Sequence, residues 1–184
     1  VSGFTTTGSS ILTDVEVLPR GLQFWRFSST WIGGMGVVMF ALLVLPSLGR
    51  SKMTLSNVEL SSMAKDNYRY RTQMIVQILL VVYVGLTAVA TLLLKMAGMN
   101  WFDALCHAMS ACATSGFSTK NSSILFYNSP AIDTILILVM AIAGLHFGLI
   151  YATVTGKRSN LFRSEVTRFY VGMLLFCSLA IAVS

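Results

Sequence analysis

Three long segments without a charged side chain constrain this fold more than any other feature of the sequence. Residues 27–48, 72–94 and 134–156 contain no Lys, Arg, Asp or Glu. A helix needs about 20 apolar residues to cross a hydrocarbon core of about 30 Å. The chain is 55% hydrophobic and only 11% charged, whereas soluble domains carry about 25% charged residues. The sequence therefore predicts an all-α polytopic membrane protein whose spans contact the lipid bilayer.

Both ends of the sequence lie inside features that we expect to be longer. Val1 leads directly into a loop-like motif, and a fourth apolar run begins at Phe169 and continues to the last residue. We therefore expect this sequence to be a fragment of a longer polytopic protein.

Basic residues are unequally divided between the two sides of the predicted spans. Because basic loops stay on the cytoplasmic side, the distribution predicts that residues 50–71 and 157–168 are cytoplasmic and that the other loops face outside. The same rule accounts for the net charge of +6 without a nucleic-acid partner. The cytoplasmic set is Arg50, Lys52, Lys65, Arg69, Arg71, Lys157, Arg158, Arg163 and Arg168.

One apolar segment is too short to cross. With the orientation above, residues 72–94 and 134–156 are joined outside, and a helix over residues 101–112 would be only about 18 Å long. Asn100 and Asp103 are placed as a variant of the N-terminal capping box. The segment therefore predicts a re-entrant pore helix. Residues 113–117 would follow it at membrane depth, where non-helical backbone is tolerated only if protein buries it or water reaches it.

The loop after this helix repeats a motif at the start of the chain. An offset of 108 residues aligns "SGFTTTGSS" with "SACATSGFS", and Pro19 and Pro130 follow the two motifs, where helix position N1 tolerates proline. The alignment predicts an internal repeat of helix, re-entrant helix, loop and helix. The identical pairs are Ser2 with Ser110, Thr6 with Thr114, Gly8 with Gly116, and Ser10 with Ser118.

The chemistry of the two loops suits a monovalent cation. Backbone carbonyls can replace the water shell of potassium, and glycine permits the backbone angles that such a loop needs. The loops hold no carboxylate, which argues against a divalent site, and an exterior Ser/Thr/Gly-rich turn is the alternative interpretation. The candidate potassium-binding residues are Thr6, Thr7, Gly8, Thr114, Ser115 and Gly116.

Four further residues are candidates for lining or gating a pore, namely Gly33, Gly34, Gly144 and His146. The glycines would serve equally well for close helix packing. An ionisable residue at membrane depth is a functional candidate, although a neutral histidine bonded to a neighbouring helix is the simpler interpretation. A membrane enzyme would need carboxylates, histidines or a metal cluster at membrane depth, where the sequence offers only His107 and His146. The cysteines form no metal-ligand spacing. We therefore expect no enzyme chemistry and no covalently bound cofactor.

Several stretches resemble the TrkH/KtrB superfamily of bacterial potassium transporters, and most closely its TrkH branch. "TTTG" followed by "WIGGMG" and "LPSLG" is similar to a first filter and its helix, and "MSACATSGFST" and "HFGLIYATVTG" are similar to a second. The resemblance implies four potassium-channel-like helix–pore loop–helix repeats in a pseudo-fourfold arrangement around one ion path. Family members commonly have glycine where Ser115 stands, and one filter glycine per repeat implies weak selectivity.

The resemblance also implies an organisation and partners. Residues 1–49 would end the first repeat, 50–71 would form a cytoplasmic loop, 72–156 would form the second repeat, and 157–184 would begin the third. The complete chain would be a homodimer in the bacterial inner membrane, docked on a TrkA-like ring of cytosolic nucleotide-binding subunits, with potassium as its substrate.

Two other transporter classes are alternatives. One is a sodium-coupled KtrB-type transporter. The other is a secondary transporter with a midplane site, whose repeats are usually inverted, whereas these two run in the same orientation.

Overall fold

The computed structural model describes residues 1–50, 62–145 and 165–183. Within these ranges the chain is helical and contains no strand. The elements in chain order are α1 (Arg20–Arg50), α2 (Ser62–Met96), α3 (Trp101–Cys112), the short 3-10 helix η1 (Ser123–Tyr127), α4 (Pro130–Ala143) and α6 (Glu165–Val183).

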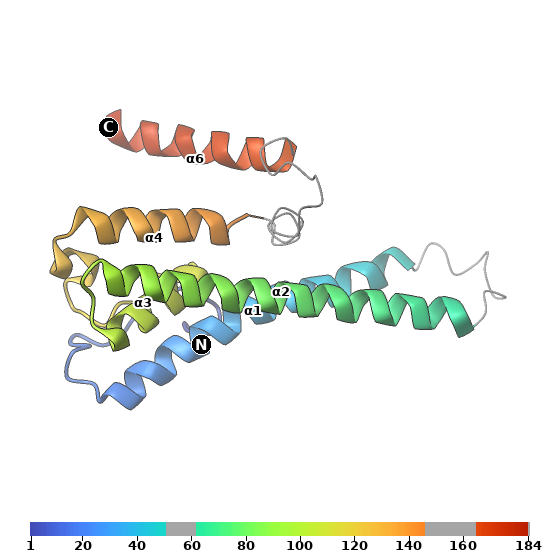
Figure 1. Ribbon diagram of the computed structural model, residues 1–184, viewed down its shortest axis with the longest axis horizontal. Helices are drawn as coiled ribbons and strands as arrows, with labels where there is room; N and C mark the ends of the chain where they lie inside the picture. Colours follow the sequence, from blue (N-terminus) through green and yellow to red (C-terminus); the bar gives the residue numbers. More distant parts are fainter. Residues whose placement is uncertain (51–61, 146–164, 184) are drawn as a thin grey trace.

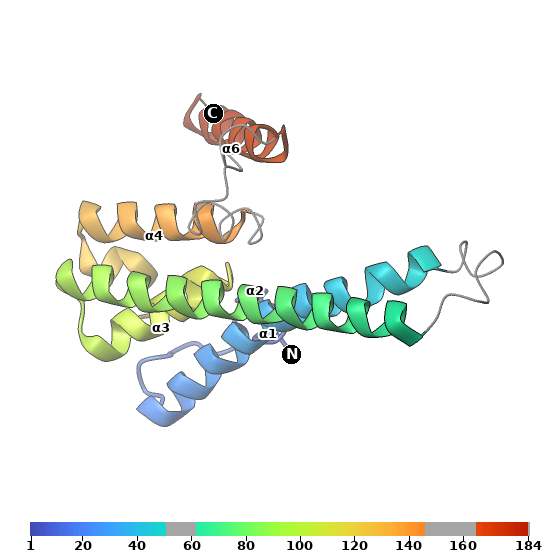
Figure 2. The same ribbon diagram turned by 45° about the vertical axis from the view of Figure 1, so that its right-hand side comes forward.

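The long helices run in alternating directions (Figures 1 and 2). α1 and α4 point one way, whereas α2 and α6 point the other way. α1 crosses α2, and this pair extends well beyond the end of α4. The short α3 lies near the opposite end, among the loops. This order agrees with two repeats that have the same orientation.

The helix lengths bear on the predicted spans. α1 and α2 contain 31 and 35 residues, so at about 1.5 Å per residue both exceed the thickness of a hydrocarbon core. Residues 27–48 and 72–94 lie within them. Among the described residues, Leu79–Met96 forms a helical window apolar and long enough to span a membrane.

The third predicted span differs from the observed helix. Helix α4 begins at Pro130, at helix position N1 as predicted, and ends at Ala143. A tight turn closes it, in which the Gly144 N–H donates to the Met140 carbonyl at 3.0 Å and the Leu145 N–H donates to the Ile142 carbonyl at 3.0 Å. A helix continuous through residues 134–156 is therefore wrong at residue 144. The stretch from residue 146 lies outside the described residues.

The short helix is confirmed residue for residue as α3, and it is enclosed by α1, α2 and α4. Its inner positions Ala104, Ala108 and Ala111 are buried against Leu94 of α2 and Leu136 of α4. Because lipid tails are as apolar as leucine, close approach of small residues stabilises such packing more than removal from solvent does. Small residues therefore allow the short α3 to pack closely against the longer helices around it.

Polar bonds join α1 to α2 beside α3. The Trp31 indole N–H donates to the Thr87 hydroxyl at 3.0 Å, and the Tyr83 hydroxyl donates to the Trp31 carbonyl at 3.1 Å. The Trp31 and Tyr83 rings also lie 5.2 Å apart. These contacts hold α1 and α2 together at the level of the loops.

The start of α3 corrects one expectation. Asn100 occupies the N-cap position, but its side chain makes no capping hydrogen bond. The Asp103 carboxylate accepts a hydrogen bond from the Thr119 hydroxyl at 2.8 Å instead. The capping box is therefore wrong, because Asp103 binds the segment that returns after the second loop.

Candidate functional site

Residues 6–8 and 114–116, called the first and second loop below, share a rare backbone signature. Thr6 and Thr114 have φ values of 53° and 52°, and Gly8 and Gly116 have φ values of 72° and 80°. Each loop therefore places two left-handed residues around one residue that is not left-handed. The predicted repeat is thus present in the backbone as well as in the sequence.

The hydrogen bonds that lead into the two loops also match. The Thr114 N–H donates to the Ala111 carbonyl at 3.1 Å and the Ser115 N–H to the Ser110 carbonyl at 3.0 Å. This pair of bonds is the Schellman motif that ends many helices. At an offset of 108, Thr6 and Thr7 make the same bonds, to Gly3 at 2.9 Å and to Ser2 at 3.1 Å.

Threonine is an unusual residue for the left-handed position that ends a Schellman motif. Glycine normally occupies it, whereas a β-branched residue with positive φ is a genuine outlier. Such residues cost about 1–3 kcal/mol and cluster at functional sites. Thr6 and Thr114 therefore mark both loops as places where the backbone shape itself is used.

The two loops lie against each other. A Cβ atom added to Gly8 would overlap the carbonyl oxygen of Ser115. Only glycine permits this close approach. The backbone of the first loop at Gly8 thus lies directly against the Ser115 carbonyl of the second loop. Ser115 is buried and its hydroxyl lies 3.1 Å from that of Ser110, whereas Thr114 and Gly116 are exposed. Both sets of candidate ion-binding residues thus converge on one place.

Glycines of α1 bring the loops close to this helix. A Cβ on Gly33 would collide with the backbone of Phe4, and one on Gly34 would lie 3.1 Å from the Cβ of Ala113. Gly33 is 13 residues after Arg20, so the first loop lies about 20 Å along α1 from its start. In Figures 1 and 2 the N-terminus accordingly lies beside the middle of α1. Both loops therefore lie beside the middle of α1 and not beside its start.

Comparison with known proteins agrees with this geometry. The profile of the TrkH family, described as a cation transport protein, matches residues 1–179.

The chain belongs to the TrkH family.

Relatives in this family are similar along nearly the whole chain. The Trk system potassium uptake protein TrkH of Escherichia coli K12 is 35% identical over 98% of the chain, and that of Halomonas elongata is 36% identical over 100% of it. The crystal structure of the potassium transporter TrkH from Vibrio parahaemolyticus superposes with a TM-score of 0.80 and 27% identity over 97% of this chain. The chain spans 38% of each of these two curated relatives and 36% of the solved protein.

Of the two remaining candidates, Gly144 and His146, the structure describes only Gly144. Gly144 caps α4, where a Cβ would strike the Tyr170 ring of α6, so this glycine permits a close contact between helices. His146 lies outside the described residues. A pore-lining or gating role for Gly33, Gly34, Gly144 and His146 stays a prediction.

A buried histidine supports the segment after the second loop. The Nδ1 atom of His107 lies 2.8 Å from the Asp103 carbonyl, so that nitrogen carries a hydrogen. In the neutral ring Nε2 then accepts from the Ser118 hydroxyl at 3.1 Å, while the Ser118 oxygen accepts the Lys120 N–H at 3.1 Å. Sequence reasoning missed this role. The sequence held no specific signal for it, because His107 bonds a backbone carbonyl of its own helix and a serine that lies 11 residues further on.

An aromatic cluster covers the other side of the second loop. Phe117, which follows Gly116, packs edge-on against Phe27 of α1 with ring centroids 6.2 Å apart. The Arg26 guanidinium lies over the Phe117 ring at 4.0 Å, in the range of a cation–π contact. α1 therefore contacts the second loop through side chains as well as through Gly34.

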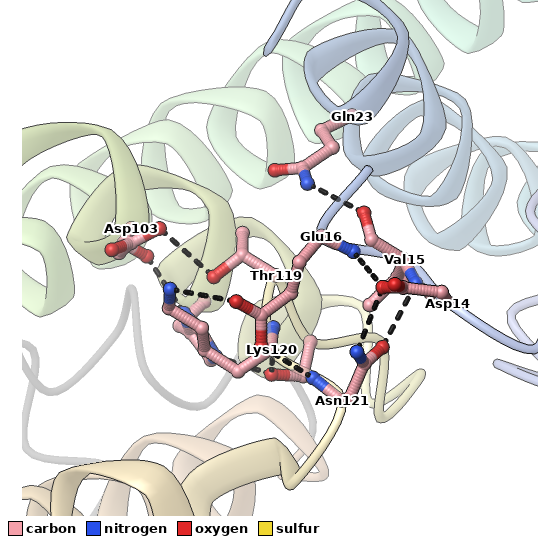
Figure 3. A network of polar contacts seen from close by, with 10 residues as sticks. Asp14, Val15, Glu16, Gln23, Asp103, Thr119, Lys120 and Asn121 are labelled. Atoms are coloured by element: carbon pink, nitrogen blue, oxygen red, sulfur yellow. Dashed lines mark hydrogen bonds and ion pairs between the residues drawn. The ribbon is translucent and has the colours of Figure 1, made fainter. Parts of the chain in front are cut away.

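A polar network joins the segments that leave the two loops (Figure 3). Asn121 contacts residues 14–16 through both its side chain and its backbone, and Lys120 forms an ion pair with Glu16 at 3.3 Å. The hydrogen bond from Asn121 is the largest cause of a lowered pKa of the Asp14 carboxyl, followed by that from the Glu16 N–H.

Within the described residues, no three His, Cys, Asp or Glu side chains are grouped closely enough to hold a metal ion. Cys106 and Cys112 are buried free thiols of α3. The candidate residues of the two loops offer backbone and hydroxyl oxygens.

Proposed function

We propose that this chain forms two neighbouring quarters of a potassium filter in a TrkH-type uptake protein of the bacterial inner membrane. The observation that carries the proposal is the contact of two loops with matching backbone. Positive φ at the first and third residue of each loop takes the backbone out of helix and strand geometry, which leaves its carbonyls available to a ligand. A row of carbonyls facing one path can then replace the water shell of a potassium ion without any covalent chemistry.

The protein surroundings suit this role. Residues 6–8 and 114–116 carry oxygens and no charge, so they favour a monovalent cation over a divalent one, which would draw on carboxylates. The C-terminal end of α3 points at the second loop, and the negative end of its dipole favours a cation there. The printed names of the relatives, which are potassium uptake proteins, agree with this substrate.

The complete protein would close the path with two further repeats in a pseudo-fourfold ring. It would act as a homodimer docked on a TrkA-like ring of nucleotide-binding subunits, with residues 50–71 and 157–168 on the cytoplasmic side. These assignments rest on family membership and on the distribution of basic residues. The sodium-coupled KtrB-type alternative predicts potassium uptake that requires external sodium, whereas the TrkH-type proposal predicts uptake without it.

The experiment is growth rescue of a potassium-uptake-deficient bacterium by the complete protein at low external potassium. Rescue by the wild-type protein and loss of rescue by Gly116→Ala are expected, because alanine at φ 80° strains the loop. Gly85→Ala is the matched control, since that helical glycine has open space around it. Membrane content is measured for each variant. Normal uptake by Gly116→Ala would overturn the filter assignment.

A further inference from the structure

We propose that Asn121 is a positioning residue that sets the geometry between the two filter loops and thereby their selectivity among alkali cations. The inference rests on the proposed function, because it concerns the same two loops. It adds a clamp formed by residues 14–16 of one repeat and residues 120–121 of the next, outside the loops themselves.

Asn121 uses three polar groups on this clamp. Its side-chain oxygen accepts the Val15 N–H at 2.8 Å, and its side-chain nitrogen donates to the Asp14 carboxylate at 2.8 Å. Its backbone N–H donates to the Glu16 carboxylate at 3.2 Å. Asn121 therefore grips three consecutive residues of the other repeat, and the Lys120–Glu16 ion pair at 3.3 Å lies beside it. Figure 3 shows these contacts together.

Both halves of the clamp are anchored to the helices that carry the loops. On one side, the buried Gln23 of α1 donates from its side-chain nitrogen to the Val15 carbonyl at 2.8 Å. On the other side, the buried Thr119 donates to Asp103 of α3 at 2.8 Å. The clamp therefore joins two segments that are each bonded to a helix, one to α1 and the other to α3.

The clamp adds a second contact between the two repeats, beside the direct contact of the two loops. The loops touch where Gly8 meets the Ser115 carbonyl. α1 also contacts the loops at Phe4 and Ala113, which precede the filter residues, and at Phe117. Without the clamp, the segments that follow the two loops could still pivot about these contacts, which would change how their carbonyls face the ion. Asn121 follows Gly116 by five residues, and Asp14 follows Gly8 by six. The clamp is therefore close enough along both strands of chain to restrict that pivot.

The clamp links the repeats and is not a copy of a feature inside each repeat. At the offset of 108 residues, Asn121 aligns with Thr13, and residues 14–16 align with Ser122, Ser123 and Ile124. The second repeat thus has no carboxylates at the positions of Asp14 and Glu16. The second repeat therefore cannot offer the same two carboxylates to a further neighbour.

The test compares the uptake of potassium, rubidium and sodium by the complete protein with that of Asn121→Ala and Asn121→Leu. The neighbouring Ser122→Ala is the control, because Ser122 is exposed on the same segment. Rates are normalised to membrane content. The sodium-to-potassium ratio should rise about threefold to tenfold in both Asn121 variants, which corresponds to the loss of about one net hydrogen bond. It should not change in Ser122→Ala.

A donor swap keeps the test decisive if the single variants accumulate poorly. Asp14→Asn combined with Asn121→Asp retains the net charge and returns a donor and an acceptor to the pair in reverse order. This double variant should recover selectivity that Asn121→Asp alone loses. An unchanged ratio in the Asn121 variants, or no recovery in the swap, would overturn the clamp while wild-type uptake upholds the filter. A wild-type protein that moves no alkali cation would overturn both.

Discussion

Gly8 and Gly116 occupy equivalent positions, yet their surroundings make different demands. Both have positive φ, which costs a residue with a Cβ about 1–2 kcal/mol. Gly116 has open space where a Cβ would be placed, whereas at Gly8 that atom would overlap the Ser115 carbonyl. A side chain at position 116 would therefore introduce conformational strain alone. A side chain at position 8 would introduce the same strain and also a collision with the second loop.

This difference predicts an order of severity. Gly116→Ala should lower the free energy of unfolding by about 1–2 kcal/mol, and Gly8→Ala by about 2–5 kcal/mol once overpacking is added. Thermal unfolding of the detergent-solubilised complete protein measures both. Equal destabilisation by the two substitutions would contradict the contact between Gly8 and Ser115.

Asp14 provides a pH dependence at the same scale. Its pKa is lowered in the folded protein, chiefly by Asn121. The resulting stability is therefore present above the unfolded pKa of about 3.9 and is lost as the pH falls through the lower folded value. The difference in thermal midpoint between wild type and Asn121→Ala should shrink upon acidification below about pH 4. A difference that stays constant with pH would exclude Asp14 as a partner that contributes in its charged form.

Sequence reasoning reached some of these residues and not others, for physical reasons. Gly8 and Gly116 were identifiable because glycine is the residue that tolerates positive φ without cost. The left-handed Thr6 and Thr114 were not, because local preference argues against that conformation and only the surrounding structure imposes it. Asn121 was also missed, since a partner 106 residues away leaves no mark in local sequence.

At the scale of elements, α1 carries three glycines in one short stretch with different roles. A Cβ on Gly33 would collide with the backbone of Phe4, and one on Gly34 would lie 3.0 Å from the Tyr83 hydroxyl. Gly36 has nothing within 4 Å. Gly36 therefore serves as a control for Gly33, because only Gly33 allows the first loop to approach α1 closely.

We expect Gly33→Ala to be destabilising and Gly36→Ala to be neutral or stabilising. The first change displaces the backbone of the first loop at a cost of about 1–3 kcal/mol. The second removes a helix-interior glycine, which is worth up to about 1 kcal/mol in helix propensity. Thermal unfolding of the two variants side by side measures the contrast. Similar loss in both would show that Gly33 is not a specific contact.

The sequence predicted the ends of α3 correctly but not the end of α4. α3 was predicted at its observed ends because its apolar run is short and is bounded by Asn100 and the Thr114 loop. The end of α4 was missed because residues 134–156 remain uncharged beyond Gly144. Hydropathy reports which residues lipid tolerates and carries no signal for a helix end inside an uncharged run. Gly144 caps α4 and packs close to Tyr170 of α6.

At the scale of the whole molecule, the central feature is the repetition of one supersecondary unit. α1 and α4 run in one direction, and α2 and α6 run in the other (Figure 1). A loop of the same backbone shape precedes α1 and follows α3. The charge distribution predicted this common orientation from sequence. The contact between the two loops required the structure, because periodicity and charge say nothing about which repeats are neighbours.

The most direct measurement is the anomalous diffraction of rubidium in crystals of the complete protein. Rubidium replaces potassium chemically and marks the bound ion by its scattering. The proposed filter predicts anomalous density bounded by backbone oxygens of residues 6–8 and 114–116. Ordered rubidium elsewhere on the ion path, with none at these two loops, would contradict the account.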